Sequence, residues 1–105
     1  MNSNGGYIYI ITNPKFDGYC KIWISENLTN RLSTYQTGDP LRQYKIEYYI
    51  FHPKYKIAEI KIKEMMKYFS TDTIQKGEWF RIPTYMAISR LQETLDDYNE
   101  NPLKY

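Results

Sequence analysis

The stretch GYIYIITN at residues 6–13, followed by YCKIWIS at residues 19–25, decides the fold of this chain. Tyrosine and isoleucine favour extended backbone, so each stretch is predicted to form a strand. Between them, Asn13-Pro14 begins a turn and Gly18 closes it, which predicts an antiparallel hairpin. Alternation along the second strand places its aliphatic side chains on one face, which we expect to be the core side. These side chains are Cys20, Ile22 and Ile24.

Outward from the hairpin, the apolar periodicity and the turn signals predict three helices and two more strands. The expected elements are a helix capped by Asn27 that ends near Gly38, a strand over 44–51, a helix over 54–69, a loop over 70–76, a strand over 77–82 and a helix capped by Thr84. The final helix is expected to bury Ile88, Leu91, Leu95 and Tyr98. The pattern therefore predicts an α+β domain with a small, mainly antiparallel sheet of three to four strands flanked by helices, in the order β-β-α-β-α-β-α. We expect a single domain over residues 1–105.

Composition excludes several classes of protein. The chain has 105 residues, 42% hydrophobic and 25% charged, values typical of a globular protein and unlike those of a disordered chain. No apolar run reaches the roughly 18 residues that a membrane span needs, and no secretion signal is recognisable, so we expect an intracellular protein without a membrane partner. With one cysteine, Cys20, and one histidine, His52, neither an internal disulfide nor a Cys/His zinc site is expected.

Charge is distributed unevenly along the chain. Residues 1–69 hold ten Lys or Arg against six Asp or Glu, whereas residues 70–105 hold four against six. A basic N-terminal region would suit a phosphate-bearing partner, although ordinary solvated faces account for the same imbalance.

Five short motifs in collinear order carry a resemblance to a known family. They are the first strand at 6–11, KIWIS at 21–25, the helix around Arg31, Ala58-Glu59 in the second long helix, and GEWF at 77–80. In this order they resemble the GIY-YIG nuclease superfamily, and most closely the T5orf172 type found in phages and large DNA viruses. The resemblance implies an endonuclease that hydrolyses DNA with one Mg²⁺ or Mn²⁺ ion.

Site residues follow from the resemblance by position. The family tyrosine corresponds to Tyr9, and Lys21 stands where many members have a second tyrosine. The family arginine corresponds to Arg31, Tyr35 lies one turn later on the same helix face, and the metal-binding glutamate corresponds to Glu59. Two further side chains, Tyr7 and Trp23, are weaker candidates for substrate binding.

These residue types suit phosphodiester hydrolysis. A guanidinium at Arg31 matches phosphate oxygens, and one carboxylate, Glu59, is enough for a Mg²⁺ ion that keeps water ligands. Phenols are poor bases near neutral pH, but an ammonium at Lys21 beside Tyr9 would lower the pKa of the phenol.

Each residue also has an ordinary structural interpretation. Tyr7, Tyr9 and Tyr35 suit packing, Lys21 suits a solvated strand, Arg31 suits a surface ion pair, Glu59 suits an i,i+4 pair with Lys63, His52 suits a strand end, and Trp79 and Phe80 suit the core.

The main departure from the family pattern is Trp23, which occupies the position of a motif glycine. Its ring would block the approach of phosphate, turn aside, or stack on a base. The alternative function is therefore a nucleic-acid-binding module with weakened or lost catalysis. A monomer and a homodimer are both compatible with the sequence.

Overall fold

A computed structural model gives the fold, and it describes residues 5–54, 56–57, 60, 71–73 and 78–100. The strands are β1 (Gly6–Thr12), β2 (Tyr19–Ser25), β3 (Lys45–His52), β4 (Thr71–Thr73) and β5 (Glu78–Arg81). The helices are α1 (Leu28–Thr37) and α3 (Thr84–Glu100), with a 3-10 turn, η1 (Pro14–Phe16). The predicted α+β class is confirmed. Of the predicted helix over 54–69, the described residues Lys56, Ile57 and Ile60 are helical, and the rest lies outside the described residues.

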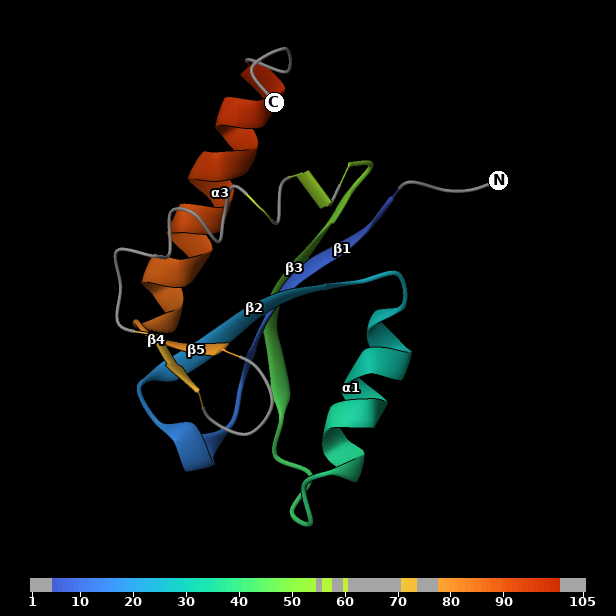
Figure 1. Cartoon of the computed structure of the whole chain (residues 1–105), viewed down its shortest axis with the longest axis vertical. Helices are drawn as coiled ribbons and strands as arrows, with labels where there is room; N and C mark the ends of the chain where they lie inside the picture. The colour runs from blue at the N-terminus through green and yellow to red at the C-terminus, as the bar shows by residue number, and fades with distance from the viewer. Residues whose placement is uncertain (1–4, 55, 58–59, 61–70, 74–77, 101–105) are drawn as a thin grey trace.

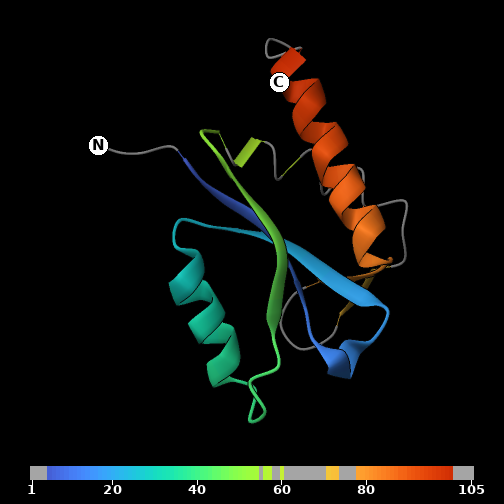
Figure 2. The ribbon, with the colours of Figure 1, turned by 180° about the vertical axis from the view of Figure 1, so that it is seen from behind.

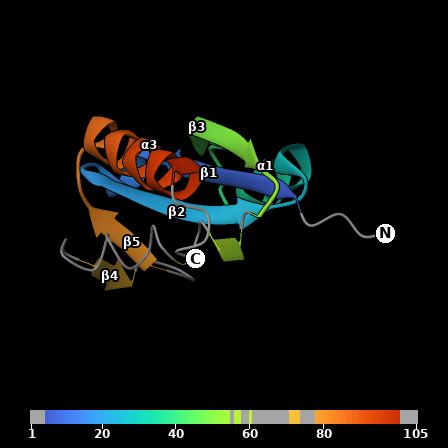
Figure 3. The ribbon, with the colours of Figure 1, turned by 90° about the horizontal axis from the view of Figure 1, so that it is seen from above.

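The described strands form one antiparallel sheet in the order β3-β1-β2-β5-β4. Seen from above, β5 and β4 continue the sheet beyond β2 on the side away from β3 (Figure 3). The fifth strand, β4, falls in the stretch predicted as a loop, because three polar residues carry no alternation and only their pairing with β5 makes them a strand.

Local signals set the ends of the elements. The Asn27 side chain accepts a hydrogen bond from the Asn30 N–H over 3.0 Å, as predicted for the cap of α1. Gly18 adopts φ 84°, a left-handed conformation that glycine tolerates best, and so closes the hairpin turn. Thr84, predicted as a cap, is already helical, and the Pro83 carbonyl accepts from the Ala87 N–H over 3.1 Å instead.

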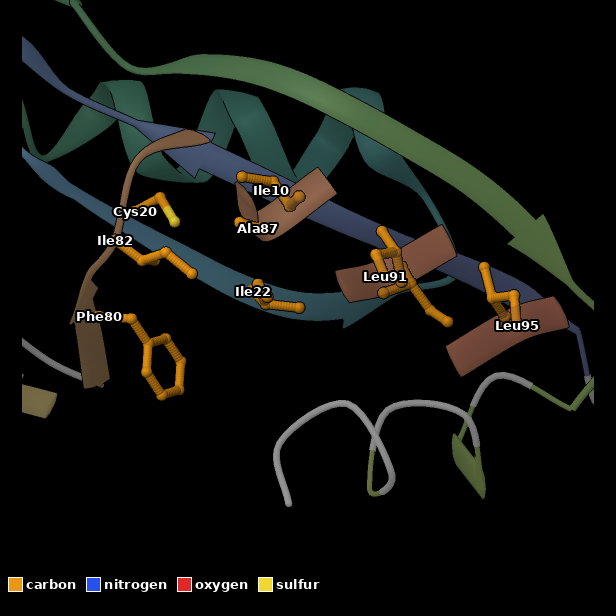
Figure 4. Packing of buried hydrophobic residues seen from close by; sticks show 9 residues of the cluster. Ile10, Cys20, Ile22, Phe80, Ile82, Ala87, Leu91 and Leu95 are labelled. Atoms are coloured by element: carbon orange, nitrogen blue, oxygen red, sulfur yellow. The ribbon is translucent and has the colours of Figure 1, made fainter. Parts of the chain in front are cut away.

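Both faces of the sheet are covered, and α1 and α3 lie on opposite sides of the twisted strands in Figure 1 and, from behind, in Figure 2. On the α3 face, the predicted aliphatic core forms between the sheet and α3 (Figure 4). Its buried members are Ile8, Ile10, Cys20, Ile22, Phe80, Ile82, Ala87, Leu91 and Leu95.

The α1 face carries a second, aromatic core. Tyr9, Ile11, Tyr44 and Trp79 are buried there, and side chains of α1 pack against them. Trp79 and Phe80 thus belong to the two cores, as their ordinary interpretation held. Because β1 and β2 alternate, the candidates Tyr9, Lys21 and Trp23 fall on this α1 face.

A buried carboxylate fastens the end of α1 to the hairpin turn. Asp39 is 2% exposed and accepts hydrogen bonds from the Asn13 amide over 3.0 Å, the Lys15 ammonium over 2.7 Å and the Gln43 N–H over 2.8 Å. These donors stabilise the charged form, so the pKa of Asp39 is held well below its usual range, chiefly by Lys15. The hydrogen bond from Asn13 to Asp39 thereby joins two residues that are 26 positions apart in the sequence.

Candidate functional site

Two tyrosines from different elements meet on the α1 face. Tyr9 of β1 lies opposite Trp23 in the β1–β2 register and opposite Tyr49 in the β1–β3 register. Its hydroxyl donates to the hydroxyl of Tyr35, on α1, over 3.3 Å. Tyr9 is completely buried whereas Tyr35 is half-buried, so the pair connects the interior to the surface.

Lys21 lies on the same face and is only 6% exposed. Its ammonium lies 5.1 Å from the centre of the Trp23 ring and 5.8 Å from that of Tyr35. The faces of aromatic rings attract cations, so both rings stabilise the charged form of Lys21. Lys21 is therefore a buried side chain on the α1 face whose ammonium contacts two aromatic rings, and not a solvated strand residue.

Trp23 thus has an observed place. Its ring is half-buried, supports the Lys21 ammonium, and lines one wall of a groove beside α1. The ring is next to the proposed site, and it has not turned away from the site.

Arg31 stands at the open side of this arrangement. Its side chain is exposed and lines the groove, which has a volume of about 520 Å³. We call this the Arg31 groove; its lining includes Trp23, Glu26, Asn27, Asn30, Arg31 and Thr34. No ion pair joins Arg31 to another described residue, and its exposed side chain lines the groove by which an anion would approach.

The electrostatics of Tyr9 differ from the sequence-based expectation. Burial and the hydrogen bond with Tyr35 raise the pKa of Tyr9 far above its usual value, and the charge of Arg31 opposes this rise only in part. Lys21 lies opposite Ile11 in the β1–β2 register, two pairs away from Tyr9. The predicted lowering of the Tyr9 pKa by Lys21 is therefore wrong, because desolvation outweighs the neighbouring positive charge.

Tyr7 lies at the start of β1, beside two aromatic residues that the sequence did not single out. Its ring meets that of Tyr49 edge-on at 5.9 Å and that of Phe51 at 5.5 Å between centroids. Tyr49 and Phe51 are 56% and 60% exposed. The alternation of β3 would have placed both side chains on one face, but it does not reveal whether another element covers them.

The metal site stays a prediction. Glu59 lies outside the described residues. Within the ranges that the structure describes, no three His, Cys, Asp or Glu side chains gather as a metal-binding group. On a separate point, none of the described helices is long and apolar enough to cross a membrane.

Fold and site together define an antiparallel α+β domain that presents a cationic and aromatic site on one face of its sheet, the class of surface suited to a phosphate-bearing polymer. The chain belongs to the T5orf172 domain family, whose sequence model matches residues 6–99. Membership is compatible with a nuclease or nucleic-acid-binding role. No curated protein and no solved structure matches the chain.

Proposed function

We propose that this protein is a metal-dependent endonuclease of the GIY-YIG superfamily that hydrolyses phosphodiester bonds in DNA. The observation that carries the proposal is the convergence of Tyr9, Lys21, Arg31 and Tyr35 on one sheet face. These residues come from three elements of a T5orf172 domain. Packing alone does not require a buried ammonium and an exposed guanidinium around a hydroxyl pair.

In the proposed reaction, the cations bind and polarise the phosphate. Arg31, at the open groove, would donate two parallel hydrogen bonds to non-bridging oxygens, and Lys21 would add a second positive charge from the surface of the sheet. Both charges oppose the negative charge that builds on the phosphate as water attacks, which lowers the barrier.

The hydroxyl pair would handle protons. Tyr9 stays protonated because burial raises its pKa, so it donates to Tyr35 and orients that hydroxyl. Tyr35 is the half-buried member, and in its phenolate form, which accepts the hydrogen bond from Tyr9, it would take a proton from the attacking water and become a phenol. A bond between phosphorus and the leaving oxygen then breaks, and that oxygen takes up a proton from solvent. In this proposal Tyr9 is the orienting group and Tyr35 the one that meets substrate.

The proposed metal would depend on Glu59. The described part of the site offers ammonium, guanidinium and hydroxyl groups together with one carboxylate, Glu26, in the wall of the Arg31 groove. Cations repel a divalent ion, so its ligand has to be a carboxylate, and Glu59 is the residue that the family pattern assigns. A bound Mg²⁺ or Mn²⁺ ion supplies Lewis acidity and lowers the pKa of a coordinated water.

One observation favours the alternative, a nucleic-acid-binding module without cleavage. Tyr9 is fully enclosed, and the Trp23 ring stands beside the groove where many family members have a glycine. Both features restrict the approach of phosphate to the hydroxyl pair, while leaving Arg31 exposed for binding.

The test is nicking of supercoiled plasmid in Mg²⁺ or Mn²⁺, with EDTA and three variants. Arg31→Ala should slow nicking by about 100- to 1,000-fold, the usual effect of removing one donor to a developing oxyanion. Glu59→Ala should lose metal-dependent nicking. Arg90→Ala is the matched control, because Arg90 lies on α3 and pairs with Glu93, away from the α1 face.

Nicking that persists in Arg31→Ala at the rate of the unaltered protein would refute the proposal. If the protein does not nick but binds DNA with a steep salt dependence, and Arg31→Ala weakens that binding, the binding module replaces the enzyme.

A further inference from the structure

A row of aromatic rings, two of them more than half exposed, lies where the start of β1 meets the end of β3, next to the proposed site. Tyr7 pairs with Phe51, and Tyr9 pairs with Tyr49, so all four side chains point to the α1 face. Of these, Tyr9 is enclosed while Tyr49 and Phe51 are more than half exposed. We call Tyr7, Tyr49 and Phe51 the aromatic edge.

The rings of the aromatic edge hold one another in place. Tyr7 meets Tyr49 and Phe51 edge-on, with interplanar angles of 67° and 72°. The Phe51 ring also lies close over the backbone of Gly5, where a Cβ atom would overlap it. Edge-to-face packing fixes the rings and leaves ring surface exposed on Tyr49 and Phe51. Ordered, exposed aromatic faces are platforms on which nucleobases stack.

Two grooves flank α1, one on the side of the aromatic edge and one on the side of Arg31. A groove of about 530 Å³ runs between α1 and β3 and is lined by Tyr7 and Tyr49. Glu26 and Asn27, at the start of α1, line both this groove and the Arg31 groove, which lies on the other flank of the helix. A strand that crosses Glu26 and Asn27 from one groove to the other would pass from the aromatic edge to Arg31.

The spacing matches a nucleic-acid strand. Tyr7 and Tyr9 are two residues apart on one strand and therefore about 7 Å apart. A stacked strand advances about 3.4 Å per nucleotide, so the aromatic edge, whose Tyr49 pairs directly with Tyr9, lies within about two nucleotides of the hydroxyl pair. Bases inside a duplex cannot reach such rings, because they are already stacked on their neighbours.

Charge favours the same occupant. At the Phe51 end of β3 the next described charged side chains are Lys54 and Lys56, both exposed. Across the grooves stands Arg31, and the acidic side chain in the lining is Glu26. Cations on both sides of an aromatic row suit a phosphate backbone with unpaired bases better than they suit a second copy of the same basic surface.

We propose that the aromatic edge is a stacking surface for unpaired bases, and that the substrate therefore has a single-stranded segment within about two nucleotides of the cleaved phosphate. This inference rests on the proposed function and names the substrate class of the same site.

The test measures binding without cleavage, in EDTA. Fluorescence anisotropy with a labelled oligothymidylate and with a duplex of equal length gives the two affinities. Phe51→Ala should weaken binding of the oligothymidylate by about 5- to 100-fold, the effect of losing one stacked base, and leave duplex affinity unchanged. Phe51→Leu keeps apolar bulk without a ring and should weaken oligothymidylate binding as much as Phe51→Ala does.

The matched control is Tyr85→Ala, because Tyr85 is 73% exposed on α3, which packs on the other sheet face. It should leave both affinities unchanged. A direct readout comes from an oligonucleotide that contains 2-aminopurine, whose fluorescence is quenched by stacking. Binding to the unaltered protein should quench the 2-aminopurine fluorescence, and binding to Phe51→Ala should leave this fluorescence unquenched.

Equal affinities of the unaltered protein and of Phe51→Ala for oligothymidylate would overturn the inference, and so would full binding by Phe51→Leu. A dimer in sedimentation that Phe51→Ala dissociates would also overturn it and assign the surface to a second copy. None of these results bears on plasmid nicking by the unaltered protein, which tests the proposed function separately.

Discussion

Replacing Trp23 by glycine, the residue of the family motif, should destabilise the protein substantially. The half-buried ring removes about 100 Å² of apolar surface from water, which contributes about 2.5 kcal/mol to stability. Its contact with the Lys21 ammonium adds about 1 kcal/mol, and glycine in a strand costs about 0.5–1 kcal/mol in backbone entropy. Because area-based values are upper bounds, we expect Trp23→Gly to lower the free energy of unfolding by about 3–4 kcal/mol.

The assay is urea unfolding, read from the midpoint and slope of the transition. Trp23→Leu keeps apolar bulk and loses the aromatic face, and Lys21→Met keeps length and loses the charge. A double-mutant cycle on these two variants should give a coupling of about 0.5–2 kcal/mol, the range of partly buried cation–π contacts.

Coupling below about 0.3 kcal/mol, within the error of additivity, would refute the view that the ring holds the ammonium. Loss of less than about 1 kcal/mol in Trp23→Gly would refute the packing argument as well, because surface substitutions away from any packed contact have effects of that size or smaller.

Two further predictions concern the loss of folding stability at acidic pH. The pKa of Asp39 is lowered on folding, so its charged form stabilises the protein above the unfolded pKa of about 3.9 and this stabilisation is lost as pH falls through the folded pKa. The melting temperature of the unaltered protein should exceed that of Asp39→Asn at pH 6, and the difference should shrink below about pH 4; a difference that does not change with pH would contradict this. Burial lowers the pKa of His52, whose Nδ1 accepts from the Lys54 N–H over 2.9 Å, so the unfolded chain binds a proton first and stability should fall as pH drops through about 6.5. His52→Asn offers another acceptor without titrating and should lose this dependence, as thermal melts between pH 5 and 8 would show.

Short-range patterns in the sequence were sufficient for most of the framework. The turn residues around Gly18, the cap at Asn27 and the alternation of the hairpin strands depend on near neighbours, and the structure has each where the sequence predicts it. Short polar strand β4 was missed because its extended form depends on pairing with β5 rather than on its own residues.

For the site, local spacing places the candidate residues, whereas contacts between distant segments set their pKa values. Alternation alone places Tyr9, Lys21 and Trp23 on one face, and helical spacing places Arg31 beside Tyr35. Desolvation depends on what distant elements cover, and this is why the raised pKa of Tyr9 came only with the packing of α1 against β1.

What the sequence determined by itself is therefore the order of the described elements apart from β4, the sheet face on which Tyr9, Lys21 and Trp23 lie, and the family resemblance, all of which depend on spacing along the chain. Tertiary structure alone decided which of those side chains are enclosed and which are open: Tyr9 inside, Arg31 outside, and Tyr49 and Phe51 exposed at the edge strand. Burial and the resulting shift in pKa come from contacts between segments far apart in sequence, and no local period encodes them.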